Sequence, residues 1–147
     1  MVNVAEHEDI YSSLIQLIAA WTASDVQRDL AGSVGVELDA TAIRALYLLG
    51  LHGGTMSAGQ LAELCHTSRP TTSKLVSRLA SDGLVDRDRT GRTVDVRLTE
   101  SGRLVYTRLV DAGKRVIADS TAGWGTDELE QFRSHLTRFV DAITATP

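Results

Sequence analysis

The sequence predicts a mainly α-helical protein with a small β-hairpin, an α+β fold, in a single domain over residues 1–147. Three observations lead to this prediction. Apolar residues recur at helical steps of three and four in long segments at both ends of the chain. In the middle, capping residues and glycines divide the chain into shorter helices. One further segment alternates apolar and polar residues after a glycine turn, which is typical of a hairpin with one buried face.

A long first helix is predicted from about Glu6 to Leu30, and Gly32 and Gly35 end it. One face of this helix is apolar, with residues at steps of three and four: Ile10, Leu14, Leu17, Ile18 and Trp21. A lone helix cannot hide such a stripe from water, so the stripe must pack against another part of the molecule.

The second helix is predicted from Asp39, which can cap its N-terminus, to the break at residues 52–54. Its apolar residues are Ile43, Leu46, Tyr47 and Leu49. Next, Ser57 and Gln60 fit a capping box, in which each side chain accepts a hydrogen bond from the backbone amide of the other. A short helix therefore follows, to about Cys65.

The next helix is predicted from Ser68 to Ser81. Ser68 can cap it, and Pro70 falls in its first turn, where a missing N–H costs nothing. Asp82 and Gly83 end it, since Gly readily adopts the left-handed conformation of a helix terminus. The inward stripe consists of Thr72, Leu75, Val76 and Leu79.

A hairpin follows, with a first strand from Leu84-Val85 and a turn at Thr90-Gly91. The second strand alternates Val94, Val96 and Leu98 with Thr93, Asp95 and Arg97. Two short helices followed by such a hairpin predict a winged helix-turn-helix over about residues 38–99. This module places its second helix in the major groove of DNA.

Two helices end the chain. Thr99 can cap the first of them, which is expected to run past Val116. Trp124 lies in a break between two glycines, and Thr126 is the predicted cap of the last helix. The apolar stripe of that helix is Leu129, Phe132, Leu136, Phe139, Val140 and Ile143. Residues 6–31 and 100–146 thus flank the winged module, and packing them against a second copy would hide their apolar faces.

The distribution of charge supports binding to nucleic acid. The whole chain has a formal net charge of −4, but residues 66–108 contain nine Lys or Arg and only five acidic residues. A local basic region is what phosphate binding needs, and the charge of the whole chain is a poor guide to it.

The helix 68–81 has a polar and basic outward face. Arg69 can take the acceptor edge of guanine, and Thr71 or Ser73 can meet a thymine methyl group or a phosphate. Lys74 and Arg78 fit phosphate contacts, which position a helix without reading sequence. The predicted DNA-binding residues here are Ser68, Arg69, Pro70, Thr71, Ser73, Lys74, Ser77 and Arg78. The alternative interpretation is an ordinary solvated helix face.

Arg89 and Arg92 near the tip of the hairpin are predicted to contact DNA as well, because narrow minor grooves attract Arg. The alternative is a charged hairpin tip that only keeps an edge strand soluble.

The segment SAGQLAELCHTSRPTTSKLVSRLASDGLV, followed by VDVRLTESG, resembles the MarR family, the multiple antibiotic resistance regulators of bacteria. The similar core covers about a third of the chain, and the order of the flanking helices agrees over nearly all of it. The resemblance rests on the combination of Ser-x-x-Thr-x-Ser-Lys-Leu-Val-x-Arg-Leu with Asp-Gly-Leu-Val and Leu-Thr-x-x-Gly.

The resemblance implies a homodimeric transcription regulator that binds a pseudo-palindromic DNA operator. Its dimer interface would be built from the first helix and the last two. The helix 68–81 would enter the major groove, and the wing would touch the minor groove. Many relatives are repressors that leave their DNA when a small phenolic or other aromatic ligand binds. This ligand binds between the dimer region and the DNA-binding lobe.

The wing departs from the family pattern. The family usually carries Asp-x-Arg or Asp-Arg-Arg on a longer loop, and the loop 86–92 is shorter by a few residues. Thr90 stands at the Asp position, Gly91 at the first Arg and Arg92 at the remaining Arg. The usual Asp–Arg brace of the wing is therefore expected to be missing.

Aromatic side chains are candidates for an effector pocket, since aromatic rings suit an aromatic ligand. The predicted ligand-binding residues are Tyr11, Trp21 and Tyr47, and Trp124 is a further candidate. Each of these side chains could equally serve core or dimer packing.

Other chemistry finds less support in the sequence. Cys65 can be a thiol sensor or a small buried residue, and its place at the end of a short helix favours burial. The four histidines lack helical metal-ligand spacing. No catalytic motif is present, so we expect neither an enzyme nor a cofactor, and a winged module that binds a protein partner is the main alternative. Without an apolar run or a signal peptide, the chain is expected to be cytoplasmic and not membrane-bound.

Overall fold

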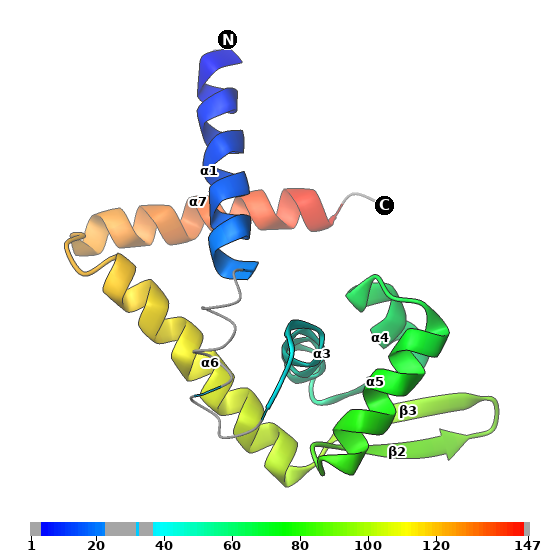
Figure 1. The fold of residues 1–147 in the computed structure, drawn as a ribbon. Helices are drawn as coiled ribbons and strands as arrows, with labels where there is room; N and C mark the ends of the chain where they lie inside the picture. The colour runs from blue at the N-terminus through cyan, green and yellow to red at the C-terminus, as the bar shows by residue number, and fades with distance from the viewer. Residues whose placement is uncertain (1–3, 23–31, 33–36, 146–147) are drawn as a thin grey trace. The chain divides into compact units, whose positions relative to one another are not determined.

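The computed structural model describes residues 4–22, 32 and 37–145 (Figure 1). The chain divides into two compact units, one up to Ala112 and one from Gly113 onward. The first unit holds α1 (Val4–Thr22), α3 (Ala40–Leu51), α4 (Ala58–Cys65), α5 (Arg69–Ser81) and three strands. Helix α6 (Glu100–Ser120) crosses from the first unit into the second, which also holds α7 (Thr126–Thr144).

The first helix is confirmed over Val4–Thr22, and the rest of its predicted length, with Gly35, lies outside the described residues. None of the helices in the described ranges is long and apolar enough to cross a membrane.

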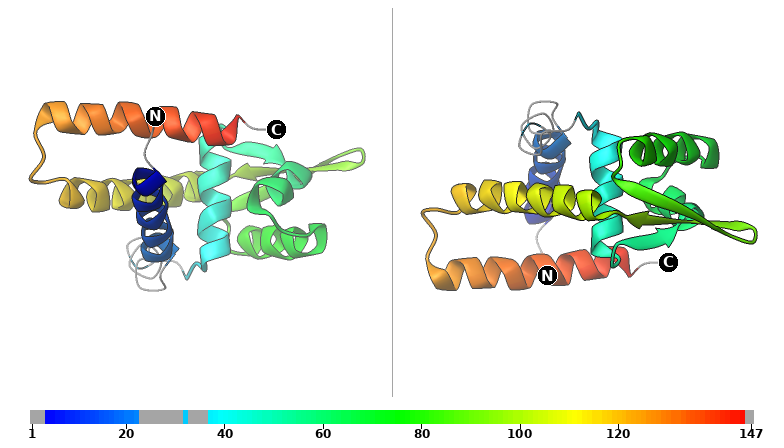
Figure 2. Two further views of the ribbon diagram at one scale, coloured as in Figure 1. Left: turned by 90° about the horizontal axis from the view of Figure 1, so that it is seen from above. Right: turned by 90° about the horizontal axis from the view of Figure 1, so that it is seen from below.

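A three-stranded antiparallel sheet packs against α3, α4 and α5. Its strands are β1 (Thr55–Ser57), β2 (Val85–Thr90) and β3 (Thr93–Leu98), in the order β1-β3-β2. The β2–β3 hairpin is the predicted wing, and it projects beyond α5 (Figures 1 and 2). Strand β1 was not predicted, because three residues are too few for an alternation pattern. It forms by pairing with β3, with Met56 opposite Val96.

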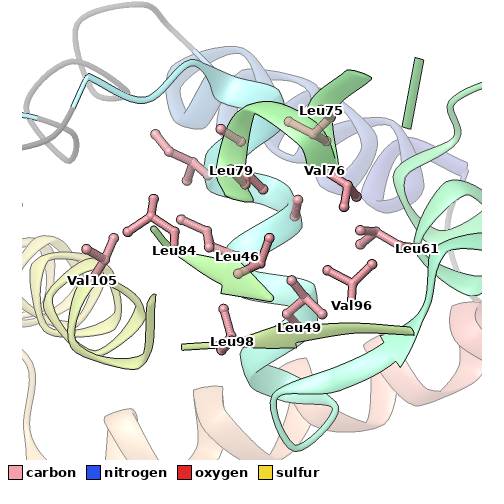
Figure 3. Close-up of a cluster of buried hydrophobic side chains, with 14 of the residues drawn as sticks. Leu46, Leu49, Leu61, Leu75, Val76, Leu79, Leu84, Val96, Leu98 and Val105 are labelled. Atoms are coloured by element: carbon pink, nitrogen blue, oxygen red, sulfur yellow. The ribbon is translucent and has the colours of Figure 1, made fainter. Parts of the chain in front are cut away.

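The core of the first unit lies between α3, α4, α5, the sheet and the start of α6 (Figure 3). Leu46, Leu49, Leu61 and Leu79 are fully buried there. The four predicted inward residues of α5 are all buried. The hydroxyl of Thr72, although buried, forms hydrogen bonds with the hydroxyl of Thr67 at 2.8 Å and with the Ser68 carbonyl at 3.1 Å.

Local side-chain chemistry fixes most helix ends where the sequence predicts them. The Asp39 carboxylate accepts from the Ala42 amide at 2.8 Å, and the capping box of Ser57 and Gln60 is complete. Ser68 caps α5, and Gly83 follows its end with a φ of +71°. The Thr99 hydroxyl accepts from the amide of Gly102, within the first turn of α6, at 3.0 Å.

Two predicted boundaries are wrong by one residue. Thr126 does not cap α7, because Glu128 reaches back to the Gly125 amide at 2.7 Å and makes Gly125 the cap position. The hairpin turn is Gly91-Arg92, not Thr90-Gly91, because Thr90 and Thr93 are still paired across the strands. Gly91 supplies the turn with a φ of +64°, a conformation that costs Gly little.

Candidate nucleic-acid interface

Helix α5 presents one buried face and one polar face, as the spacing of its residues requires. Arg69, Pro70, Ser73 and Lys74 are exposed on the polar face, with Thr71 and Arg78 also exposed and Ser77 half-buried. Ser68 caps the first turn of α5 and Pro70 lies within that turn. These two residues fix where the helix begins, and therefore fix the backbone that carries Arg69 and Lys74.

The two hydroxyls at the start of α5 are partly used for capping. The Ser68 hydroxyl accepts from the Thr71 amide at 3.3 Å and lies 2.8 Å from the Thr71 hydroxyl. Each hydroxyl oxygen still has capacity for another hydrogen bond, because a hydroxyl offers one donor and two acceptor lone pairs.

Arg78 lies on the same helix, and its side chain forms an ion pair with another residue of the chain. Its guanidinium lies 2.6 Å from the carboxylate of Asp39, the cap of α3. Burial by itself would raise the pKa of the Asp39 carboxyl, but the Ala42 amide and the Arg78 guanidinium together hold this pKa below its ordinary value. Arg78 therefore ties α5 to the start of α3.

Strand register gives the wing two faces of opposite charge. Arg87 is opposite Val96 and Arg89 is opposite Val94, so both arginines share the face that carries the buried residues Val85 and Leu98. The other face carries acidic residues and one Arg: Asp86 opposite Arg97, and Asp88 opposite Asp95.

A hollow of about 340 Å³ lies between the start of α5, the start of α4 and the wing. Three arginines from separate places line it: Arg69 of α5, Arg87 of β2 and Arg92 of the turn. Among the residues that the structure describes, no acidic one lines it. The Arg87 guanidinium also donates to the Ser77 hydroxyl at 3.0 Å, which connects the wing to α5.

The hollow therefore unites three of the predicted DNA-binding residues, Arg69, Ser73 and Arg92, while Lys74 and Arg89 are not among the residues that line it. Arg87 was not singled out in the sequence. Strand alternation was the signal that could have found it, because Arg87 is two residues before Arg89 and so points to the same face.

The aromatic candidates for an effector site have separate surroundings. The Tyr47 hydroxyl donates to the Leu109 carbonyl at 2.8 Å, and its ring packs edge-on against Tyr106. These contacts give Tyr47 a structural role. Tyr11 is 65% exposed and Trp21 is half-buried on the same helix α1, about 15 Å apart along its axis. Trp124 packs edge-on against Phe132 in the second unit.

Cys65 is buried at the end of α4, and burial raises the pKa of its thiol despite the opposing effect of Arg44. A raised pKa leaves less of the reactive thiolate form, so this environment favours a small buried residue over a thiol sensor. In the part of the chain that the structure describes, no cluster of His, Cys, Asp or Glu could hold a metal ion.

Two of the helices that flank the winged module, α1 and α7, expose apolar side chains. On α1 these include Ile10, Leu17 and Ile18, and on α7 the whole predicted stripe from Leu129 to Ile143 is exposed. None of the described residues of α7 is buried.

Comparisons with known proteins agree with this architecture. The family model described as MarR family matches residues 37–93. A MarR family protein from Bacillus stearothermophilus is similar in structure, with a TM-score of 0.82 and 24% identity over 98% of this chain and 99% of the other. A MarR family transcriptional regulator from Silicibacter pomeroyi has a TM-score of 0.70 and 25% identity, and 97% of each chain is covered.

A third similar structure is NadR in complex with 4-hydroxyphenylacetate, with a TM-score of 0.67 and 22% identity over 95% of this chain and 97% of the other. No curated protein sequence matches the chain. The resemblance to the MarR family and the winged-helix fold are confirmed by these matches.

Proposed function

Since residues 37–93 match the MarR family and the chain has the MarR winged-helix fold, we propose that the protein is a homodimeric, sequence-specific DNA-binding regulator of transcription in the cytoplasm. The observation that carries the proposal is the basic surface formed by the outward face of α5 and the hollow beside it. This surface contains Arg69, Lys74, Arg87 and Arg92 in a chain whose net charge is −4. Positive charge concentrated on one helix and the adjacent wing is suited to the phosphates of duplex DNA.

The proposed dimer brings two copies of α5 to one duplex. The apolar faces of α1 and α7 support it, because a helix with such a face must bury it against another surface. A two-fold dimer would place its recognition helices at half-sites about one helical turn apart, which matches a pseudo-palindromic operator.

We further propose that the regulator is a repressor that a small aromatic ligand releases. The complex of the similar protein NadR with 4-hydroxyphenylacetate supports this class of ligand. For the protein to leave the DNA, the ligand must bind more tightly to a dimer geometry in which the spacing of the two recognition helices does not fit the operator. A ligand with equal affinity for both geometries would leave the equilibrium between them unchanged.

The test is binding of the full chain to the duplex just upstream of its own coding region, titrated with salt and unlabelled competitor. We expect saturable binding that survives competitor, with one dimer per site. Arg69→Ala with Lys74→Ala should weaken it at least about fivefold, because a good Arg–guanine contact alone contributes about 1–3 kcal/mol.

The matched control is Arg44→Ala with Arg97→Ala, which removes the same charge from exposed residues of the same unit outside the hollow and the outward face of α5. Equal losses in both double variants would contradict recognition by α5. Weak binding that any duplex competes away would favour instead a winged module with a protein partner.

A further inference from the structure

We propose that the hollow between α4, α5 and the wing is a seat for one phosphate group of the DNA backbone, and that Arg87 is one of its ligands. This inference rests on the proposed function. The inference goes beyond the proposed function because it assigns a specific site for phosphate and names Arg87, which the sequence alone does not single out.

The first argument is the uncompensated charge of the hollow. Arg69, Arg87 and Arg92 line it, and no acidic residue from the described ranges of the chain does. In the described part of the chain, none of these three arginines forms an ion pair. The acidic residues of the wing lie on its opposite face. Three guanidinium groups around one hollow repel one another, and an anionic oxygen group between them relieves that repulsion.

The second argument is the set of donors at the floor of the hollow. Ala58 and Gly59, which open α4, line it together with Ser57. The first amides of a helix have no acceptor within the helix, and the positive end of the helix dipole favours an anion. Gly59 has no side chain to cover its backbone. Two apolar residues, Val76 and Val94, also line the hollow.

The third argument identifies the occupant as the DNA backbone. The hollow lies between α5, the helix proposed to enter the major groove, and the wing, proposed to reach the neighbouring minor groove. One phosphate backbone separates two neighbouring grooves of a duplex, so a phosphate must pass between these two elements. The hydrogen bond from Arg87 to Ser77 holds the guanidinium at this place before DNA arrives.

The experiment measures the salt dependence of DNA binding for the full chain and the variant Arg87→Gln. Loss of one phosphate contact should reduce the magnitude of the slope of log K against log salt by about 0.9. Affinity should fall by a similar factor for operator and unrelated duplex, because a phosphate contact carries no sequence information. Arg97→Gln is the matched control, since Arg97 lies on the opposite face of the same hairpin, and its slope should equal that of the unaltered protein.

A second arm replaces single backbone phosphates of the operator by neutral methylphosphonate. At one position in each half-site, the replacement should weaken the unaltered protein but not weaken Arg87→Gln further. Inorganic phosphate at constant ionic strength provides the third arm. Competition with DNA should be several-fold stronger for the unaltered protein than for Arg87→Gln, because the free anion and the backbone phosphate would occupy the same seat. Competition of that kind without any position-specific methylphosphonate effect would assign the seat to a free anion and overturn the assignment to the backbone.

An unchanged slope for Arg87→Gln, or weaker binding that lacks a position-specific methylphosphonate effect, would overturn the proposal while specific DNA binding by the unaltered protein stands. No specific binding by the unaltered protein would overturn the proposed function and this inference together. Should Arg87→Gln unfold, as circular dichroism would reveal, Arg92→Gln tests the same seat and should show the same loss of slope.

Discussion

The ion pair between Arg78 and Asp39 yields a quantitative prediction, because Asp39 has two roles that separate variants can remove. Its carboxylate caps α3 through the Ala42 amide and also binds the Arg78 guanidinium at 2.6 Å. Asp39→Ala removes both roles. Asp39→Asn keeps the cap, since Asn and Asp are about equally good at this position, and removes the charge.

The expected magnitudes follow from the exposure of the pair. Both side chains are half-exposed, at 50% for Arg78 and 52% for Asp39, so solvent screens their attraction. Exposed pairs contribute about 0.2–1 kcal/mol, and a helix cap contributes about 1 kcal/mol. We therefore expect Asp39→Asn to lower the free energy of unfolding by less than about 1 kcal/mol, and Asp39→Ala by about 1–2 kcal/mol.

The effect depends on pH in a defined direction. The folded protein lowers the pKa of Asp39 below its ordinary value of 3.8. A lowered pKa means that the carboxylate stabilises the fold above the unfolded-state pKa, and that this stabilisation is lost as pH falls through the folded-state value. The difference between the unaltered protein and Asp39→Asn should therefore be full at pH 7 and vanish in acid.

Urea unfolding at pH 7, and at a series of values below pH 4, measures these differences. One fixed protein concentration is used, because the proposed dimerisation would make stability depend on concentration. Arg78→Gln should match Asp39→Asn at pH 7. Equal losses for Asp39→Asn and Asp39→Ala would refute the separation of the two roles. A difference that persists at low pH would refute its electrostatic origin.

Two further predictions concern buried positions. Gly102→Ala should lower the free energy of unfolding by about 3 kcal/mol or more, because its Cβ would collide with the Leu84 carbonyl oxygen and press on Leu98. Gly123→Ala, which nothing crowds within 4 Å, should change it by less than about 0.5 kcal/mol, and similar losses in urea unfolding would refute the packing argument. The thiol of Cys65, whose pKa is raised by burial, should react with a thiol reagent at neutral pH only after unfolding in urea. Rapid modification of the folded protein would instead support a thiol sensor.

The sequence predicted best those features that neighbouring residues decide. The caps at Asp39, Ser57 and Ser68 form within three residues of the amides they accept from, so local chemistry was sufficient. The wing turn and the start of α7 were each wrong by one residue, since strand pairing at Thr90 and the side chain of Glu128 decide those boundaries.

Features that join distant parts of the chain could not be predicted in the same way. Strand β1 exists only because β3 lies beside it. Arg78 fits a phosphate contact from its place on α5, and only the fold shows that Asp39 is close enough to bind it. Likewise, no spacing rule places Arg69, Arg87 and Arg92 around one hollow, because they come from three separate elements.

The opposite charges of the two faces of the wing have a consequence for the proposed binding to DNA. Asp88 and Asp95 lie directly opposite each other on one face, and such a pair of like charges destabilises the hairpin slightly. The same pair would repel a phosphate backbone, whereas Arg87 and Arg89 on the other face attract it. In the proposed complex, the duplex would therefore lie against the face that carries Arg87 and Arg89, which is joined to α5 through Ser77. Asp88 and Asp95 would thus disfavour an inverted approach of the proposed duplex, at a small cost in hairpin stability.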